Sequence, residues 1–218
     1  MISKQTKKPD IIIVDDNLTF LKCLTFLINI DNVATVIGKA SNDKEFIDLL
    51  SHMKPDLVLM DINMLQASGM EATQMALEMI PDLKIIAFTM FGDEEYYYKM
   101  NNLGIKGFIL KSAGINELEK AIRNVMKGEN YLSDELLKKF IINFGRRTTD
   151  KSIENAGLTA RETKVMHYIC QGLTNEEIAQ RLSVGLIAVN DYKLNLLEKI
   201  RGQYTTPIAP LNSVLSLN

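Results

Sequence analysis

The chain has 218 residues, of which 46% are hydrophobic and 24% charged, a balance that is ordinary for a soluble globular protein and argues against a disordered one. The formal net charge is −2. Residues 1–125 hold 13 basic and 17 acidic residues, for a net −4, whereas residues 126–218 hold 12 and 10, for a net +2. Such a mildly basic second half excludes strong general attraction to nucleic acid, so any such contact must rest on locally placed residues.

No stretch approaches 18 uninterrupted apolar residues, as a membrane-spanning helix requires. The lysine-rich start, residues 1–10, leads into only four apolar residues, which is too short for a signal peptide. We therefore expect a cytoplasmic protein with no membrane partner. Cys23 and Cys170 lie far apart in the sequence, which gives little support to a disulfide or a metal site, and we expect both to be buried thiols.

Short apolar runs alternate with segments of helical periodicity through the first half of the chain. This alternation predicts an α/β fold with a five-stranded, doubly wound parallel sheet, covered by helices on both faces. The predicted strands are residues 10–14, 33–38, the run that ends at Asp61, 84–89 and 107–110, and the predicted helices are residues 18–30, 43–52, 71–79, 93–102 and 115–127.

Polar residues follow four of these strands. Asp15 and Asp16 follow the first strand, Asp61 the third, Thr89 ends the fourth and Lys111 follows the fifth. The carboxyl ends of parallel strands meet at one edge of the sheet, where ligands collect. Three carboxylates from two strand ends offer the hard oxygen ligands that Mg²⁺ prefers.

This set of groups suits the transfer of a phosphoryl group to a carboxylate. Asp61 would be the nucleophile, the acids would hold Mg²⁺, Lys111 would be a second cation and Thr89 a hydroxyl donor. Taken alone, each residue is more often ordinary: a strand-end Asp caps a helix, and a Lys lies on the surface. Their joint placement at successive strand ends favours the functional interpretation.

Residues 10–127 resemble the receiver domain of two-component response regulators, which has a flavodoxin-like fold. The resemblance rests on Asp15–Asp16, on residues 55–61, on Gly69, on Thr89 and on residues 107–111. It implies that Asp61 is the phosphoacceptor of a histidine kinase and that Asp15 or Asp16, Asp61 and the Asn63 carbonyl hold Mg²⁺. It also implies that Thr89 and Lys111 bind the phosphoryl oxygens and that Phe108 is an aromatic switch.

Two positions depart from the receiver pattern. Leu65 stands where the family usually has Pro, and Ser112 replaces a Pro that is often reached through a cis bond. The second change is common in the NarL/FixJ-type subgroup, so we expect phosphorylation to be retained. A new phosphoryl group should draw the Thr89 hydroxyl inward and let the Phe108 ring follow. Two interpretations fit the tyrosine run of Tyr96, Tyr97 and Tyr98. Either these residues contact a partner, or one of them faces the core and two lie on the surface.

We divide the chain into a receiver domain (8–127), a helical connector and linker (128–154) and a second domain (155–218). The connector contains one amphipathic helix, residues 133–144, followed by a polar stretch. In the second domain, Thr159 with Glu162 and Thr174 with Glu177 each form a predicted capping box at a helix start.

The second domain is predicted to be a small all-α, helix-turn-helix domain with helices 160–170, 175–182 and 186–200. It resembles the LuxR-type output domain of NarL/FixJ regulators in residues 158–162, 172–175 and 177–179 and in Leu182.

The third helix departs from the output-domain pattern. The usual Thr-Val-Lys-x-His start appears as Ala188 to Tyr192, so a Lys is lost and Asp191 enters, while Leu194 and Glu176 replace polar or basic residues. These changes should lower DNA affinity on the order of 10- to 1,000-fold. The remaining candidate DNA contacts are Asn190, Lys193, Asn195, Lys199 and Arg201. Pro207 and Pro210 break the final helix, which in the family usually carries dimer contacts.

The sequence therefore predicts a response regulator, not an enzyme, that is phosphorylated on Asp61 by a histidine kinase. It would form a homodimer on phosphorylation and control transcription through DNA. The alternative is a phospho-switched protein-interaction regulator whose helix-turn-helix no longer binds DNA. An aspartyl-phosphate phosphatase would need a second acid two residues after the nucleophile, where this chain has Asn63.

Overall fold

The computed structural model describes residues 8–64, 69–90, 92, 94–147 and 156–202. The chain divides into two compact units, Met1–Leu136 and Leu137–Asn218. This boundary falls inside helix α6 (Asp134–Arg147), which had been predicted as part of the connector and to end at Phe144. Among the described helices, none is long and apolar enough to cross a membrane.

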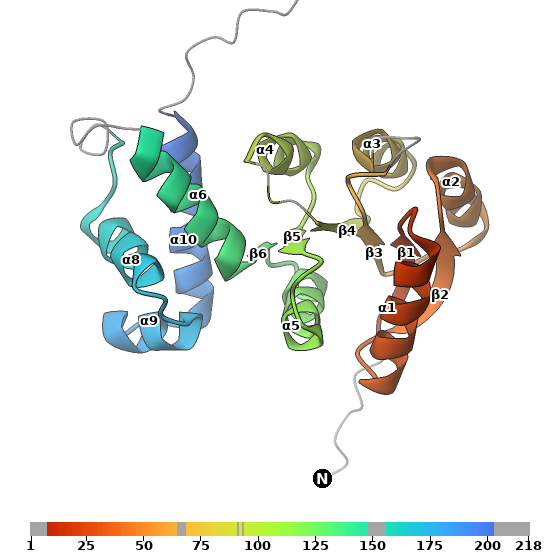
Figure 1. Cartoon of the computed structure of the whole chain (residues 1–218), viewed down its shortest axis with the longest axis horizontal. Helices are drawn as coiled ribbons and strands as arrows, with labels where there is room; N and C mark the ends of the chain where they lie inside the picture. The colour runs from red at the N-terminus through yellow and green to blue at the C-terminus, as the bar shows by residue number, and fades with distance from the viewer. Residues whose placement is uncertain (1–7, 65–68, 91, 93, 148–155, 203–218) are drawn as a thin grey trace, which may run out of the picture. The chain divides into compact units, whose positions relative to one another are not determined.

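The first unit contains a parallel sheet with the strand order β2-β1-β3-β4-β5-β6 (Figure 1). The strands are β1 (Asp10–Val14), β2 (Thr35–Ala40), β3 (Leu57–Met60), β4 (Lys84–Thr89), β5 (Gly107–Leu110) and β6 (Tyr131–Leu132). The predicted parallel α/β sheet is confirmed, and a sixth strand is added at the edge. The sequence did not reveal β6 because two residues are too few to show a periodic pattern.

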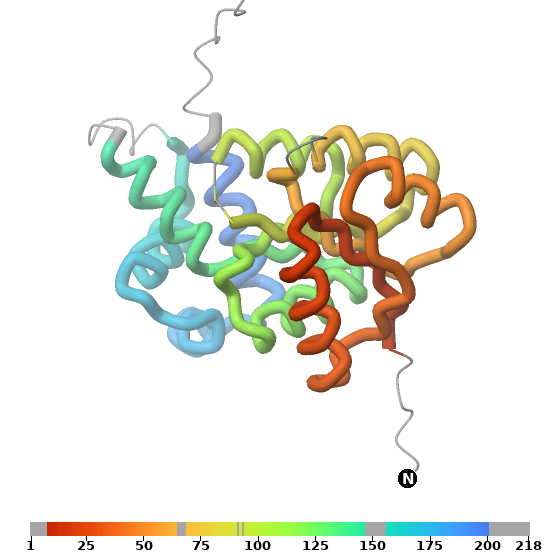
Figure 2. The backbone as a smooth tube through the Cα atoms, turned by 45° about the vertical axis from the view of Figure 1, so that its right-hand side comes forward, coloured from red at the N-terminus to blue at the C-terminus, as the bar shows by residue number. Residues whose placement is uncertain are grey.

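Helices cover both faces of this sheet, as Figures 1 and 2 show. They are α1 (Leu18–Ile30), α2 (Asp43–His52), α3 (Gly69–Met79), α4 (Glu94–Leu103) and α5 (Ile115–Met126). Helices α1 and α5 pack on one face, where Leu24 and Leu118 join Ile11, Leu59 and Ile109 in one apolar core. Helices α2, α3 and α4 lie on the other face. The core therefore fixes the strands, and with them the loops at their carboxyl ends.

The second unit contains α8 (Ala160–Cys170), α9 (Asn175–Leu182) and α10 (Leu186–Gly202). Both predicted capping boxes are present: Thr159 pairs with Glu162 at the start of α8, and Thr174 pairs with Glu177 at the start of α9. Ser183 ends α9 in the left-handed conformation, which makes the tight turn into α10.

The expectation of two buried cysteines was wrong, because both side chains are exposed. On α1 the inward stripe is Leu21, Leu24 and Ile28, and Cys23 lies beside it. On α8, Ile169 occupies the inward position next to Cys170.

Gly69, the first residue of α3, lies against the backbone that follows β3. A Cβ atom added there would come within 2.1 Å of the Asp61 carbonyl oxygen and 2.7 Å of the Ile62 Cα. Backbone atoms cannot rotate away, so Gly69→Ala should destabilise the protein by about 1–3 kcal/mol or more. The same change at Gly145 inside α6, where an added Cβ meets nothing, should stabilise it by up to about 1 kcal/mol. Urea unfolding followed by circular dichroism measures both, and equal effects would contradict this reasoning.

Glu162 joins α8 to α10. Its Oε2 accepts from Lys199 Nζ at 2.7 Å and from the Thr159 N–H at 2.7 Å. Burial alone would raise the pKa of Glu162, but these hydrogen bonds outweigh burial and hold it below the ordinary value of 4.5. The ionised carboxylate therefore stabilises the fold above pH 4.5, and that contribution is lost as the pH falls through the lowered pKa.

Glu162→Gln should thus destabilise the second unit by about 1–3 kcal/mol near neutral pH, because the charge-assisted bond to Lys199 is lost. The difference from wild type should vanish in acid. Lys199→Met should cost little more once Glu162 is already Gln. Urea melts at several pH values test this, and a loss independent of pH would refute it.

Candidate functional site

Asp15 and Asp61 follow neighbouring strands of the sheet and lie at its carboxyl edge. Each is fixed by its backbone, since the Asp61 N–H donates to the Val14 carbonyl at 2.9 Å and the Asp15 N–H donates to the Ala40 carbonyl at 3.0 Å. Both side chains are buried, with 1% and 4% of their surfaces exposed. The fold therefore holds two carboxylates side by side where water is largely excluded.

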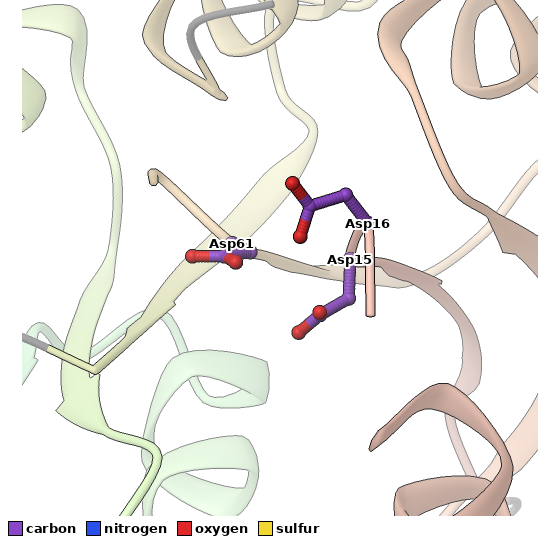
Figure 3. Close-up of side chains that lie close together, drawn as sticks. All are labelled: Asp15, Asp16 and Asp61. Carbon is purple, nitrogen blue, oxygen red and sulfur yellow. The ribbon is translucent and has the colours of Figure 1, made fainter. Parts of the chain in front are cut away.

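Asp16 completes a cluster of three acids (Figure 3). One carboxylate oxygen from each of Asp15, Asp16 and Asp61 lies within 4.8 Å of the others. The cluster is made of hard oxygen donors from two strand ends, and such donors are what Mg²⁺ takes in proteins. The three residues that the sequence proposed as carboxylate ligands are thus together, while ligation by the Asn63 carbonyl stays a prediction.

Lys111 lies between two of these acids. Its Nζ is 2.5 Å from Asp15 Oδ2 and 2.7 Å from Asp61 Oδ2, and only 5% of its side chain is exposed. The Lys111 N–H donates to the Thr89 carbonyl at 2.7 Å, which fixes its position at the end of β5. One ammonium against three carboxylates leaves a formal charge of −2, and a divalent cation would neutralise it.

The pKa of Asp15 lies above its ordinary value of 3.8. Burial is the main cause, and the nearby charge of Asp61 adds to it. The hydrogen bonds from Lys111 and from the Asn17 N–H act in the opposite direction but do not cancel burial. The ionised cluster is therefore under electrostatic stress that a bound cation would relieve.

Thr89 and Asn63 extend the site toward β4. The Thr89 side chain is completely buried, and its Oγ1 accepts from Asn63 Nδ2 at 3.2 Å. The Asn63 N–H also donates to Asp61 Oδ1 at 3.0 Å. Asn63 therefore links the acid to the hydroxyl, with its backbone N–H on Asp61 and its side-chain amide on Thr89. The sequence did not reveal this link because it depends on the path of the loop.

The sequence also did not predict that the ring of Phe20 contacts Lys111. Lys111 Nζ lies 4.7 Å from its centre, and the same ring packs on Phe88 at 5.7 Å. An aromatic residue near the start of a helix usually packs in the core, so the sequence did not indicate a cation–π contact with this ring.

Phe108 contacts α4 through Tyr97. Its ring meets Tyr97 edge to face, with centroids 5.4 Å apart and planes at 84°. Both side chains are buried, whereas Tyr96 is 40% exposed. Tyr97 is thus the inward ring of the tyrosine run, Tyr96 is exposed and Tyr98 is half-buried, while contact of the run with a partner stays a prediction.

The predicted DNA contacts of α10 do not share one surface. Lys193 is 3% exposed and donates to Asn175 Oδ1, and Lys199 is bonded to Glu162. Both cations thus serve contacts within the second unit, although the Lys199 side chain is 34% exposed, and their contact with DNA stays a prediction. Asn190 is half-buried and Asn195 is exposed. The side chain of Arg201 lies outside the described residues.

Two further cations of the second unit contact aromatic side chains. Arg161 Nη1 donates to the Tyr192 hydroxyl at 2.7 Å, and the Arg181 guanidinium lies 5.3 Å from the centre of the Tyr168 ring. The start of α10 instead exposes apolar and acidic groups, because Ile187 is 60% exposed and Asp191 is exposed.

The chain matches two family models. Residues 11–123 match the response regulator receiver domain, and residues 156–206 match the bacterial regulatory proteins of the luxR family. Among curated proteins, the oxygen regulatory protein NreC of Staphylococcus aureus strain bovine RF122 / ET3-1 is 34% identical over 195 residues, which is 87% of this chain and 90% of NreC. NreC of strain JH9 is 33% identical over the same shares.

Two solved structures illustrate the likeness in fold. A LuxR-family response regulator from Aurantimonas sp. SI85-9A1 has 26% identity and a TM-score of 0.57, covering 60% of this chain and 93% of that one. The response regulator RcsB, solved in complex with DNA, has 20% identity and a TM-score of 0.54 and covers 89% and 92%. With the receiver model matched across half of the sequence, the chain belongs to the two-component response regulators of the NarL/FixJ type, transcription regulators with a receiver domain and a LuxR-type helix-turn-helix domain.

Proposed function

We propose that Asp61 accepts a phosphoryl group from a histidine kinase in the cytoplasm, that Mg²⁺ held by Asp15, Asp16 and Asp61 assists, and that the phosphorylated chain acts on DNA as a homodimer. The observation that carries the proposal is Lys111, which is bonded to both Asp15 and Asp61 at a buried sheet edge. The Lys111 ammonium beside Asp61 supplies positive charge at the place where the phosphoryl group would be transferred.

In the transfer, the bond between phosphorus and a histidine nitrogen of the kinase breaks, and a bond to an Asp61 oxygen forms. Asp61 Oδ1 accepts from the Asn63 N–H and Oδ2 accepts from Lys111, so the carboxylate is held in one orientation. Each oxygen keeps a further lone pair for attack. Mg²⁺ supplies positive charge for the phosphoryl oxygens when it is bound.

Lys111 and Thr89 then stabilise the product. An ammonium has three N–H donors, so Lys111 can bond both acids and still donate to a phosphoryl oxygen. The Thr89 hydroxyl accepts from Asn63 in the observed structure. A phosphoryl oxygen is a strong acceptor that would draw this hydroxyl toward it and remove it from Asn63. Phe108 of β5 and Tyr97 of α4 form a buried ring pair, and we propose that the change at Thr89 is passed on through it.

A second candidate is a regulator whose helix-turn-helix binds protein instead of DNA. The observation that favours it is the use of Lys193 and Lys199 inside the second unit, together with the exposed Asp191. These two lysines are then less available for phosphate contacts, whereas Arg161, Lys164 and Arg181 are exposed and the LuxR-type family match is retained.

Incubation with acetyl phosphate and Mg²⁺ tests the phosphoacceptor. The intact protein should gain the mass of one phosphoryl group, and Asp61→Asn should gain none, because an amide is not a nucleophile here. Asp56→Asn is the matched control, since Asp56 binds the Asp10 N–H away from the cluster. Intact-mass spectrometry decides the matter, and an adduct on Asp61→Asn equal to that on wild type would disprove the assignment.

The raised pKa of Asp15 predicts how stability responds to pH and to Mg²⁺. Without Mg²⁺, stability should fall as the pH rises from 3.8 through the raised pKa, because the folded state resists ionisation of this carboxyl. Free Mg²⁺ at a concentration ten times its dissociation constant should raise the free energy of unfolding by about 1.4 kcal/mol.

Asp15→Asn should remove both the fall with pH and most of the response to Mg²⁺. Urea unfolding at several pH values, with and without MgCl₂, measures this. A variant that is stabilised by Mg²⁺ as strongly as wild type would show that Asp15 is not a ligand.

The DNA proposal predicts a shallow dependence on salt. With Lys193 and Lys199 engaged internally, the logarithm of the binding constant should fall with the logarithm of salt concentration at a slope of only about −1 to −3 per domain. Asp191→Lys should make the slope steeper by about one unit. Fluorescence anisotropy of the phosphorylated protein on its DNA site measures the slope. Absence of any specific site would instead favour the protein-binding candidate.

A further inference from the structure

The first two and a half turns of α10 expose a small patch of apolar, amide and acidic side chains. It consists of Ile187, Asn190, Asp191 and Leu194, which are spaced three and four residues apart and therefore share one side of the helix. Ile187 is 60% exposed, Asp191 is exposed, and Asn190 and Leu194 are half-buried. We call these four residues the reading patch.

The orientation of the reading patch is fixed by the opposite side of α10. Val189, Leu196, Leu197 and Ile200 are each at most 1% exposed. The helix contacts both α8 and α9 through its buried side. Rotating the helix to present another face would expose this apolar stripe, so the patch is held outward by the core of the unit.

In helix-turn-helix proteins, the N-terminal residues of the second helix contact base edges in the major groove. The reading patch lies in those turns of α10 and contains no Lys or Arg. A cation of that kind is the usual partner of guanine. An Asn side chain matches the N6 and N7 atoms of adenine, and an apolar side chain matches the methyl group of thymine.

Asp191 adds discrimination by repulsion. An ionised carboxylate is only an acceptor, and guanine presents two acceptors, O6 and N7, to the major groove. A guanine beside Asp191 would therefore bring like partial charges together. Cytosine presents an amino group there, and adenine presents one beside its N7 acceptor, so a carboxylate can accept a hydrogen bond from either base.

We propose that the reading patch selects A·T base pairs, with the Asn190 amide on adenine N6 and N7 and with Ile187 and Leu194 against thymine methyl groups. Asp191 excludes guanine from the adjoining position. The inference rests on the proposed action on DNA and adds to it the class of sequence that the protein recognises.

Selection from random duplexes with the phosphorylated, full-length protein provides the binding site. The preferred half-site should contain an A·T step with no guanine at the patch. Replacing its thymines by deoxyuridine removes only the methyl groups and should weaken binding about tenfold. Replacing the adenine by 7-deazaadenine removes only N7 and should have an effect of similar size.

Protein variants assign each effect to a side chain. Ile187→Ala and Leu194→Ala together should abolish the penalty for deoxyuridine, and Asn190→Ala should abolish the penalty for 7-deazaadenine. Ile142→Ala is the matched control, because Ile142 is a 41% exposed isoleucine on α6, outside the reading patch. It should keep both penalties. Thermal melting of each variant checks that the second unit remains folded.

The outcomes separate the two proposals. If the selected site binds equally well without the thymine methyl groups and adenine N7, or if it has a guanine at the patch, then the proposed role of the reading patch is wrong. The proposal that the protein binds DNA would still stand. Failure to select any sequence, by protein that carries the phosphoryl group, would overturn both. Loss of each penalty in its own variant, with the control unchanged, would establish the assignment.

Discussion

The contact of Lys111 with Asp15 and Asp61 is the interaction on which the rest of the receiver unit depends. Two buried carboxylates on neighbouring strands would repel each other strongly if they were left alone, and burial already raises the pKa of Asp15. One ammonium, held at the end of β5 by its own backbone bond to Thr89, offsets part of that repulsion. The negative charge that remains on the three carboxylates would be offset by a divalent cation, so the same clustering of acids that burial opposes is what suits the site to a metal ion.

Much of this site follows from the sequence because parallel strands bring their carboxyl ends to one edge. Each strand-end residue could be found as the first polar residue after an apolar run, as with Asp61 after β3 and Lys111 after β5. Contacts made by loops did not follow in this way. The bond from Asn63 to Thr89 joins residues 26 apart and depends on where the chain turns after β3, which no periodicity encodes.

In the second unit, the sequence shows which residues are charged but not which of them are available for DNA. Their charge makes Lys193 and Lys199 predicted DNA contacts, although charge alone does not say which way a side chain faces. The apolar stripe of Val189, Leu196 and Ile200 places Lys193 on the inner side of α10, so periodicity did contain the answer for that residue. Lys199 is different, because its bond to Glu162 joins two helices and requires the tertiary fold.

The two cysteines have a practical value that follows from their exposure. They are the only thiols in the sequence, and one lies in each compact unit, on α1 and on α8. Partial burial raises the pKa of Cys170, which leaves less reactive thiolate there and slows its modification. Two spectroscopic probes can therefore be attached without altering the chain, and the separation between them followed as the acyl phosphate forms and decays.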